Sequence, residues 1–163
     1  MLAKEVGELL RSRKETVAVA ESCTGGKVGD MMTDIPGSSD YFLGGIISYS
    51  NQAKLDLLGV SSNTLASKGA VSEEVAIQMA HGARERLKAT YGIALTGIAG
   101  PAGGSKTKPV GLVYIAIASS YEKACERNVF KGSRKEIKTL AAERSLNMLL
   151  EFISKSRPSQ THN

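Results

Sequence analysis

Two short apolar segments, each followed directly by a glycine-rich turn, constrain the fold of this 163-residue chain more than any other feature of its sequence. Residues 16–20 predict a buried strand that runs into the turn at 21–26, and residues 91–96 predict a second strand that runs into the glycine loop at 97–104. Ligands of open α/β sheets bind at the carboxyl ends of the strands. We therefore expect a ligand site between these two loops.

Helical and extended patterns alternate along the rest of the chain until two strands follow each other near its end. Residues 110–118 and 123–130 are extended runs joined by a short turn, which predicts an antiparallel hairpin. We therefore expect an α/β protein with three layers, α/β/α, and a mixed, mostly parallel sheet that ends in this late hairpin. Helical patterns cover residues 2–10, about 26–34, 51–58, 72–88 and 137–152, residues 41–49 predict a strand interrupted by Gly44-Gly45, and residues 60–71 predict a polar loop.

The chain is expected to form one domain, because no linker, internal repeat or low-complexity run divides it. We place that domain at residues 1–154 and a frayed polar tail at 155–163. The longest nearly apolar run, 110–118, is too short to span a bilayer, and charged residues stand where a signal peptide needs an apolar stretch. We expect a soluble cytoplasmic protein that does not associate with membranes.

The amino-acid composition limits which kinds of metal site and ligand the chain can have. With two Cys and two His, the chain offers neither a disulfide scaffold nor a Cys/His zinc cluster, although a carboxylate-bound metal stays open. Most of the net charge of +5 falls in residues 122–163, and the aromatic residues, with no Trp, provide few platforms for stacking single-stranded nucleic acid. A solvated basic helix is the ordinary explanation of this charge. The functional alternative is a small ligand that carries a phosphate, not a nucleic acid.

Ser22 is the first candidate for chemistry because it stands at the strand-to-helix turn. The amides of Thr24, Gly25 and Gly26 are expected to be unpaired donors at the helix start, where they can hold an oxyanion or a phosphate. The same residues also suit a plain helix cap, since Ser and Thr are ordinary N-cap residues. Position alone leaves both interpretations open.

Other nucleophiles and bases have weaker support. Cys23 could act as a thiolate at the same helix start, but no histidine partner is apparent. His162 lies in the expected tail, and His81 lies within a helix beside nothing that resembles a triad partner. A Ser-His-Asp triad is therefore not expected.

Lys54 remains as the base that a serine nucleophile needs. It is the only basic residue between positions 28 and 67, and it follows an expected strand end closely. An exposed lysine is the commoner case, but a desolvated lysine that loses its proton acts as the base in Ser-Lys pairs. Tyr49, five residues earlier, would share the proton relay or pack in the core.

Five motifs, in this order along the chain, then give a specific resemblance. They are Ala20-Glu21-Ser22-Cys23-Thr24-Gly25-Gly26, Tyr49-Ser50-Asn51-Gln52-Ala53-Lys54, Gly69-Ala70-Val71-Ser72-Glu73, Thr96-Gly97-Ile98-Ala99-Gly100-Pro101-Ala102-Gly103-Gly104-Ser105 and Lys108-Pro109-Val110-Gly111. From about residue 3 to residue 153, the chain resembles the CinA C-terminal domain family, also called competence-damage-inducible proteins, in a stand-alone form.

The resemblance implies a nicotinamide mononucleotide (NMN) amidohydrolase, or NMN deamidase. Such an enzyme converts NMN and water to nicotinate mononucleotide and ammonia in pyridine-nucleotide salvage, and it needs no cofactor and no metal. Amide hydrolysis requires a nucleophile, an oxyanion pocket and a proton for the leaving ammonia. The resemblance makes Ser22 the nucleophile and Lys54 its proton acceptor, with Tyr49 close to both.

The remaining site residues are also carried over from the family. The family often has Arg where this chain has Lys138, so the grip on phosphate is expected to be weaker. Glu21 or Glu73 would balance the pyridinium charge, although a carboxylate in a first helical turn is the simpler interpretation of Glu73. Thr24 and the amides of Gly25 and Gly26 would support the oxyanion, Thr96, Gly97 and Gly100 would line the nucleotide pocket, and Arg134 would bind the phosphate.

Two other classes of function stay open. A nucleotide-binding or regulatory module without turnover would use the same glycine loops, with Ser22 as a cap only. A structural or partner-binding protein would use the basic last helix. We also expect a homodimer or higher homo-oligomer, because the late edge strand leaves a surface for pairing.

Overall fold

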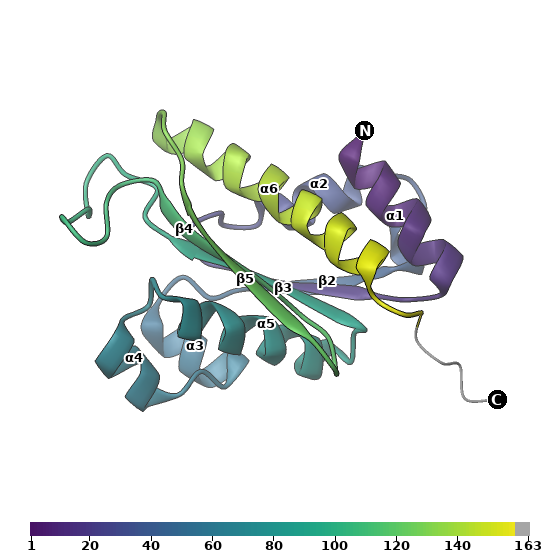
Figure 1. The fold of residues 1–163 in the computed structure, drawn as a ribbon, viewed down its shortest axis with the longest axis horizontal. Helices are drawn as coiled ribbons and strands as arrows, with labels where there is room; N and C mark the ends of the chain where they lie inside the picture. The colour runs from purple at the N-terminus through teal and green to yellow at the C-terminus, as the bar shows by residue number, and fades with distance from the viewer. Residues whose placement is uncertain (159–163) are drawn as a thin grey trace.

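A five-stranded sheet lies between two layers of helices in the computed structural model, which describes residues 1–158 (Figure 1). The expected polar tail overlaps the last helix, which ends at Lys155, and residues 159–163 of that tail lie outside the described residues. The strands are β1 (Val17–Glu21), β2 (Phe42–Ile47), β3 (Tyr91–Gly97), β4 (Leu112–Ala118) and β5 (Lys123–Val129). The helices are α1 (Leu2–Arg13), α2 (Lys27–Thr33), α3 (Asn51–Leu58), α4 (Ser62–Lys68), α5 (Glu73–Leu87) and α6 (Arg134–Lys155), with a 3-10 turn at Ser38–Asp40.

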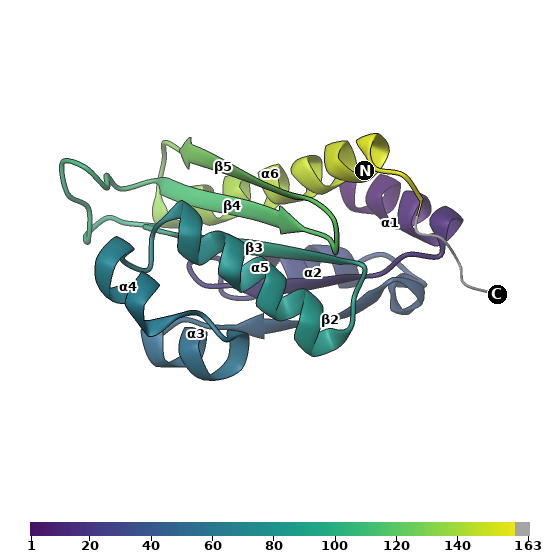
Figure 2. The ribbon, with the colours of Figure 1, turned by 60° about the horizontal axis from the view of Figure 1, so that its bottom comes forward.

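The strand order β2-β1-β3-β4-β5 confirms the expected mixed sheet. β1 pairs in parallel with both β2 and β3, whereas β4 is antiparallel to β3 and to β5. Four of the five strands therefore run in the same direction, and the hairpin of β4 and β5 completes the sheet. Figure 2 shows β2 and β5 at its two edges. The carboxyl ends of β1 and β3, where the two glycine-rich loops begin, lie side by side.

Alternation along β1 builds the two sides of the core. Val17 and Val19 face the layer of α1, α2 and α6, while Ala18 and Ala20 face the layer that contains α5. The packing of α5 against the sheet is tight, since a Cβ on Gly92 of β3 would collide with the carbonyl oxygen of Ala80 in α5. Small residues at this interface let α5 lie close against the sheet.

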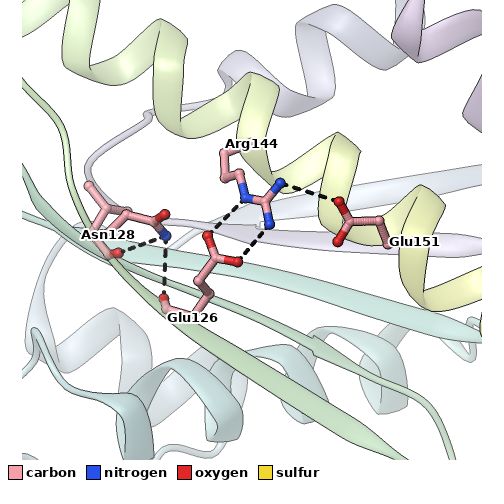
Figure 3. A network of polar contacts seen from close by, with 5 residues as sticks. Glu126, Asn128, Arg144 and Glu151 are labelled. Atoms are coloured by element: carbon pink, nitrogen blue, oxygen red, sulfur yellow. Dashed lines mark hydrogen bonds and ion pairs between the residues drawn. The ribbon is translucent and has the colours of Figure 1, made fainter.

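The free edge of the late hairpin is tied to α6 by a polar network (Figure 3). Arg144 donates from Nε and Nη2 to the two carboxylate oxygens of Glu126 at 2.8 and 2.7 Å, and from Nη1 to Glu151 at 3.4 Å. The hydrogen bonds that Glu126 accepts from Arg144 hold the pKa of this carboxyl below its usual range. Asn128 extends the network by donating to the backbone oxygen of Glu126. β5 is thus a charged edge strand that α6 holds in place.

Local sequence chemistry explains most element ends. Gly59, in a left-handed conformation, closes α3, and Ser72 caps α5 through its hydroxyl, as expected. The interruption at Gly44 is confirmed as an irregularity in register, since Val17 pairs with Phe42 but the next residue of β1 pairs with Gly44.

The expected polar loop at residues 60–71 is wrong, because it contains α4. Its sequence carries a single large apolar residue, Leu65, and so lacks an apolar periodicity. The helix forms because the Ser61 hydroxyl caps its start and Leu65 packs against the α5 side of the core. None of the helices in residues 1–158 combines the length and the apolar character that a bilayer crossing requires.

Candidate active site

A cavity of about 260 Å³ opens between the two glycine-rich loops at the carboxyl ends of β1 and β3. Ser22 directly follows β1, and its amide donates to the carbonyl of Leu95 in β3 at 3.0 Å, which fixes the residue against the sheet. Gly25 and Gly26 take left-handed conformations that let the chain turn sharply from β1 into α2. The lining residues are Ser22, Cys23, Tyr49, Asn51, Lys54, Ala70, Val71, Thr96, Gly97, Ile98, Ala99, Gly100, Ala102, Gly103 and Arg134.

The structure brings Ser22 and Lys54 into direct contact. Lys54 Nζ lies 3.1 Å from Ser22 Oγ, and the lysine is 1% exposed, so the interpretation as a surface lysine is wrong. The side chain reaches this position from the first turn of α3, which begins where the Ser50 hydroxyl accepts a hydrogen bond from the amide of Ala53. Ser22 Oγ is therefore paired with an amine.

Two backbone carbonyls complete the surroundings of the Lys54 amine. Nζ donates to the carbonyl oxygen of Ser48 at 2.7 Å and to that of Tyr49 at 3.4 Å. Burial lowers the pKa of Lys54 from its ordinary value. In the neutral form, the two carbonyls still accept the two N–H groups, so the lone pair is left facing the Ser22 hydroxyl. This geometry suits a proton acceptor.

The capping interpretation of Ser22 is wrong, because Glu21 does the capping. The Glu21 side chain is buried, and its carboxylate accepts from the amides of Val28 and Gly29 at 3.0 and 3.1 Å, which neutralises the start of α2. The N-cap position itself is Gly26, without a side-chain hydrogen bond. Glu21 is thus committed to the helix and is not placed to balance a substrate's positive charge.

The expected oxyanion donors are only partly free. The amide of Gly25 donates to the carbonyl of Ser22 at 3.1 Å, which closes the tight turn, so the expectation of an unpaired amide there is wrong. The amides of Thr24 and Gly26 have no hydrogen-bond partner in the described part of the chain. The hydroxyl of Thr24 is also buried, and within residues 1–158 it is unpartnered. Within residues 1–158, Thr24 and Gly26 thus keep unpaired donor groups in the turn that follows Ser22, although neither residue is among those that line the cavity.

Tyr49 and Arg134 lie at the mouth of the cavity. Tyr49 is 64% exposed, so its alternative role in the core is wrong, and its hydroxyl accepts from Arg134 Nη2 at 3.2 Å. Arg134 also donates from Nη1 to the carbonyl of Gly100 at 2.8 Å. It stands at the start of α6, where Ser133 and Glu136 form a capping box. The Tyr49 hydroxyl therefore contacts Arg134 instead of the Ser22 and Lys54 side chains.

Thr96 lines the cavity, but its hydroxyl is already used. Thr96 Oγ1 donates to the carbonyl of Ala70 at 2.8 Å and so holds the segment between α4 and α5 against β3. Gly97 has no room for a side chain, since a Cβ there would lie 2.5 Å from the carbonyl oxygen of Leu112. Gly97 and Gly100 of the second glycine loop both line the cavity. Sequence reasoning did not name as site residues the further lining residues Asn51, Ala70, Val71, Ile98, Ala99, Ala102 and Gly103, although all belong to motifs that it had identified.

The other candidates for nucleophile, base or charge-balancing group have weaker support in the structure. Burial raises the pKa of Cys23 to about 11, which keeps the thiol protonated. His81 lies on α5 outside the cavity lining, and burial and Arg84 lower its pKa. Glu73 is exposed in the first turn of α5, which fits its interpretation as a carboxylate at a helix start. His162 lies outside the described residues.

A second cation stands near the turn that carries Ser22. Lys138 follows Arg134 by one turn of α6, and a Cβ on Gly25 would lie 3.8 Å from its Nζ. The two side chains share one face of the helix. Within residues 1–158, no three His, Cys, Asp or Glu side chains gather in a group that could hold a metal ion.

Comparisons with known proteins identify the family and the fold that this chain resembles. Residues 1–153 match the family model described as the CinA C-terminal domain. A "CinA-like protein" of Cyanothece sp. is 56% identical over 153 residues, which are 91% of this chain and 36% of that protein. A "putative competence-damage inducible protein" of Halothermothrix orenii is 48% identical, over 93% of this chain and 37% of that protein. The chain spans just over a third of the length of these curated relatives.

Solved structures agree with the sequence matches. The competence/damage inducible protein CihA from Agrobacterium tumefaciens is 40% identical and superposes with a TM-score of 0.91, covering 94% of both chains. The competence damage-inducible protein A (ComA) from Klebsiella pneumoniae is 30% identical with a TM-score of 0.93, covering 96% of this chain and 97% of that chain. The three-layer α/β fold is the fold of these proteins.

Proposed function

The chain belongs to the CinA C-terminal domain family, and on that premise we propose that it hydrolyses the carboxamide of NMN to nicotinate mononucleotide and ammonia. The observation that carries the proposal is the contact of 3.1 Å between Ser22 Oγ and the buried amine of Lys54 at an open cavity. Ser-Lys pairs are an established variant of acyl-transfer chemistry. The reaction belongs to pyridine-nucleotide salvage, which we place in the cytoplasm.

The proposed reaction has two halves, each with one proton cycle through Lys54. Ser22 Oγ attacks the carboxamide carbon as neutral Lys54 accepts the hydroxyl proton, and the hydroxyl of Thr24 with the amides of Thr24 and Gly26 stabilises the oxyanion. The intermediate collapses to an acyl-enzyme ester, and the departing amine takes the proton from Lys54 to leave as ammonia. Lys54 then deprotonates a water, which hydrolyses the ester, and its proton returns to Ser22.

The shape and charge of the site support NMN as the substrate. A volume of about 260 Å³ lies just below the usual range for ligand pockets, so the nicotinamide ring would fill the cavity and the phosphate would lie at its mouth. Arg134 lines the cavity and Lys138 lies near the turn at Gly25, and we assign the phosphate to this pair of cations, although Lys138 offers no bidentate grip. The pyridinium makes the carboxamide carbon more electrophilic, and phosphate binding positions the ring.

A nucleotide-binding or regulatory module without turnover is the alternative function. Such a module needs Ser22 only as a cap, but Glu21 already caps α2. It also gives no reason to bury an amine next to a serine hydroxyl, since an unpaired buried charge is costly. The geometry therefore favours catalysis over binding alone.

Ammonia release tests this function when NMN, nicotinamide, nicotinamide riboside and asparagine are compared side by side. We expect the purified protein to hydrolyse NMN fastest without added cofactor, because only NMN combines the activated carboxamide with a phosphate. The rate should be the same in EDTA, since the proposed chemistry uses an amine base and no metal. Binding of NMN without ammonia release would select the module, and a loss in EDTA restored by a divalent ion would contradict the metal-free mechanism.

We also propose that the chain forms a homodimer through β2 instead of the late strand β5. β5 carries Lys123, Glu126 and Arg127, and charged edge strands resist pairing, whereas β2 has no charged residue. Leu43 on β2 is 42% exposed and Val129 on β5 is 46% exposed, which makes them matched positions.

Sedimentation equilibrium tests this assembly. We expect a dimer for the native chain, a shift to monomer for Leu43→Lys, and no change for Val129→Lys, because only the first places a charge on the pairing edge. A native chain that stays monomeric at all concentrations, or a dimer that only Val129→Lys disrupts, would rule out pairing through β2.

A further inference from the structure

The glycine loop between β3 and β4 forms one wall of the cavity and is held at few points. Its residues 98–103 contribute most of that wall, while residues 101–107 are exposed. In Figure 1 the loop projects beyond the end of the sheet. The width of the cavity therefore depends on contacts that fix this loop from the side.

The facing wall is the short segment between α4 and α5. Ala70 and Val71 line the cavity from this segment. Thr96 Oγ1 donates to the carbonyl of Ala70, and Ser72 Oγ donates to the carbonyl of Gly69, both at 2.8 Å. The segment is thus anchored to the sheet, and it offers a fixed point to which the glycine loop can attach.

Lys108 makes that attachment. Its Nζ donates to the carbonyl oxygen of Lys68, the last residue of α4, at 2.7 Å, where a cation also suits the negative end of a helix. The backbone around Lys108 is fixed by a turn, since its amide donates to Ser105 Oγ and its carbonyl accepts from the Ser105 amide. Gly69 leaves room for the ammonium, because a Cβ there would lie 2.9 Å from Nζ.

This contact joins two motifs to which the proposed reaction gives no role. One is the segment around Gly69 to Glu73, and the other begins at Lys108. We infer that Lys108 is a positioning residue that latches the glycine loop to the α4–α5 segment and so sets the width of the substrate cavity. Because Ser22 and Lys54 lie on other elements, loss of the latch affects substrate binding much more than the chemical step.

Lys106 provides a matched control for Lys108. It lies two residues away on the same loop and carries the same charge, but it is exposed and makes no hydrogen bond or ion pair in the described part of the chain. Lys108→Met and Lys106→Met therefore remove the same charge and the same donor group from the same loop. Only the first removes the latch.

Hydrogen exchange of the unliganded protein tests the latch without any assumption about activity. We expect Lys108→Met to increase amide exchange in residues 98–111 and in 69–72, because both walls lose their mutual contact, while Lys106→Met leaves both segments unchanged. Unchanged exchange in Lys108→Met, or an equal increase in Lys106→Met, would overturn the latch.

The kinetic test rests on the proposed function. For Lys108→Met, we expect KM for NMN to rise about two- to fivefold, the typical range for one cation at the C-terminal end of a helix, with kcat nearly unchanged. The rise in KM should be similar for any other substrate that the protein hydrolyses, such as nicotinamide riboside. A rise in KM confined to NMN, together with unchanged amide hydrogen exchange, would make Lys108 a phosphate contact and overturn the latch. A native protein that releases no ammonia, together with increased exchange in Lys108→Met, would contradict the proposed function and leave the latch standing.

Discussion

Replacing Ser22 with alanine is expected to lower kcat for NMN by on the order of a thousandfold or more, as for other deletions of a nucleophile. The acyl-enzyme cannot form without Ser22 Oγ, whereas the groups that bind the nucleotide stay in place. Affinity for NMN should therefore be largely retained, which ligand-induced thermal stabilisation of the inactive variant measures. The fold should also persist, because Glu21 and not Ser22 caps α2.

Cys23→Ala is the matched control for this experiment, since Cys23 is the adjacent residue and also lines the cavity. We expect Cys23→Ala to keep most of its activity, because burial raises the pKa of the thiol to about 11 and leaves little thiolate at neutral pH. Near-native turnover in Ser22→Ala, combined with inactivity of Cys23→Ala, would assign the nucleophile to Cys23.

Lys54→Arg is expected to be nearly as damaging as Lys54→Ala, with kcat lower by a similar factor of about a thousand or more. Guanidinium stays protonated, so it cannot accept the proton from Ser22 Oγ even though it keeps the positive charge. Lys54→Arg buries a permanent charge, which can destabilise the fold, so Lys54→Met serves as a further variant. An apolar side chain often replaces a buried ion without loss of stability. If Lys54→Arg keeps most of kcat while Lys54→Ala does not, Lys54 acts as an electrostatic contact and not as the base.

The pH dependence of the native enzyme gives a second readout for Lys54. Burial lowers the pKa of this amine, and only the neutral form accepts a proton, so the rate should rise with pH through the lowered pKa and level off above it. Below that pKa the amine is protonated and the rate falls. In Lys54→Ala, the residual rate should no longer rise with pH over this range. If the rate of Lys54→Ala still rises with pH over this range, the rise reports the titration of a group other than Lys54.

Features that depend on neighbouring residues could be predicted from the sequence. The cap at Ser72 and the end of α3 at Gly59 follow from residue types whose conformational preferences act within one turn. The two glycine-rich loops were correctly placed at the ends of neighbouring strands, because parallel strands bring their carboxyl ends to one edge of the sheet. The isolation of Lys54 in the sequence left both an exposed and a desolvated lysine open, and only the structure shows that the side chain is buried.

Features that depend on which partner a side chain finds could not be predicted. Glu21 and Thr96 both looked free to contact a substrate, but Glu21 binds amides seven and eight residues later and Thr96 binds a carbonyl 26 residues earlier. Tyr49 pairs with Arg134 across 85 residues, which no local pattern encodes. The helix α4 was missed because one apolar residue gives no periodicity to detect.

Product analysis of the reaction with NMN in the presence of hydroxylamine shows whether the reaction passes through an acyl ester on Ser22. An acyl ester on Ser22 partitions between water and hydroxylamine. We therefore expect ammonia release to be accompanied by the hydroxamate of nicotinate mononucleotide, in a proportion that rises with hydroxylamine concentration. Lys54→Arg and Ser22→Ala should form neither product at a significant rate. Ammonia release that yields only nicotinate mononucleotide at every hydroxylamine concentration would mean that water attacks the amide directly, and it would contradict the Ser22 and Lys54 mechanism.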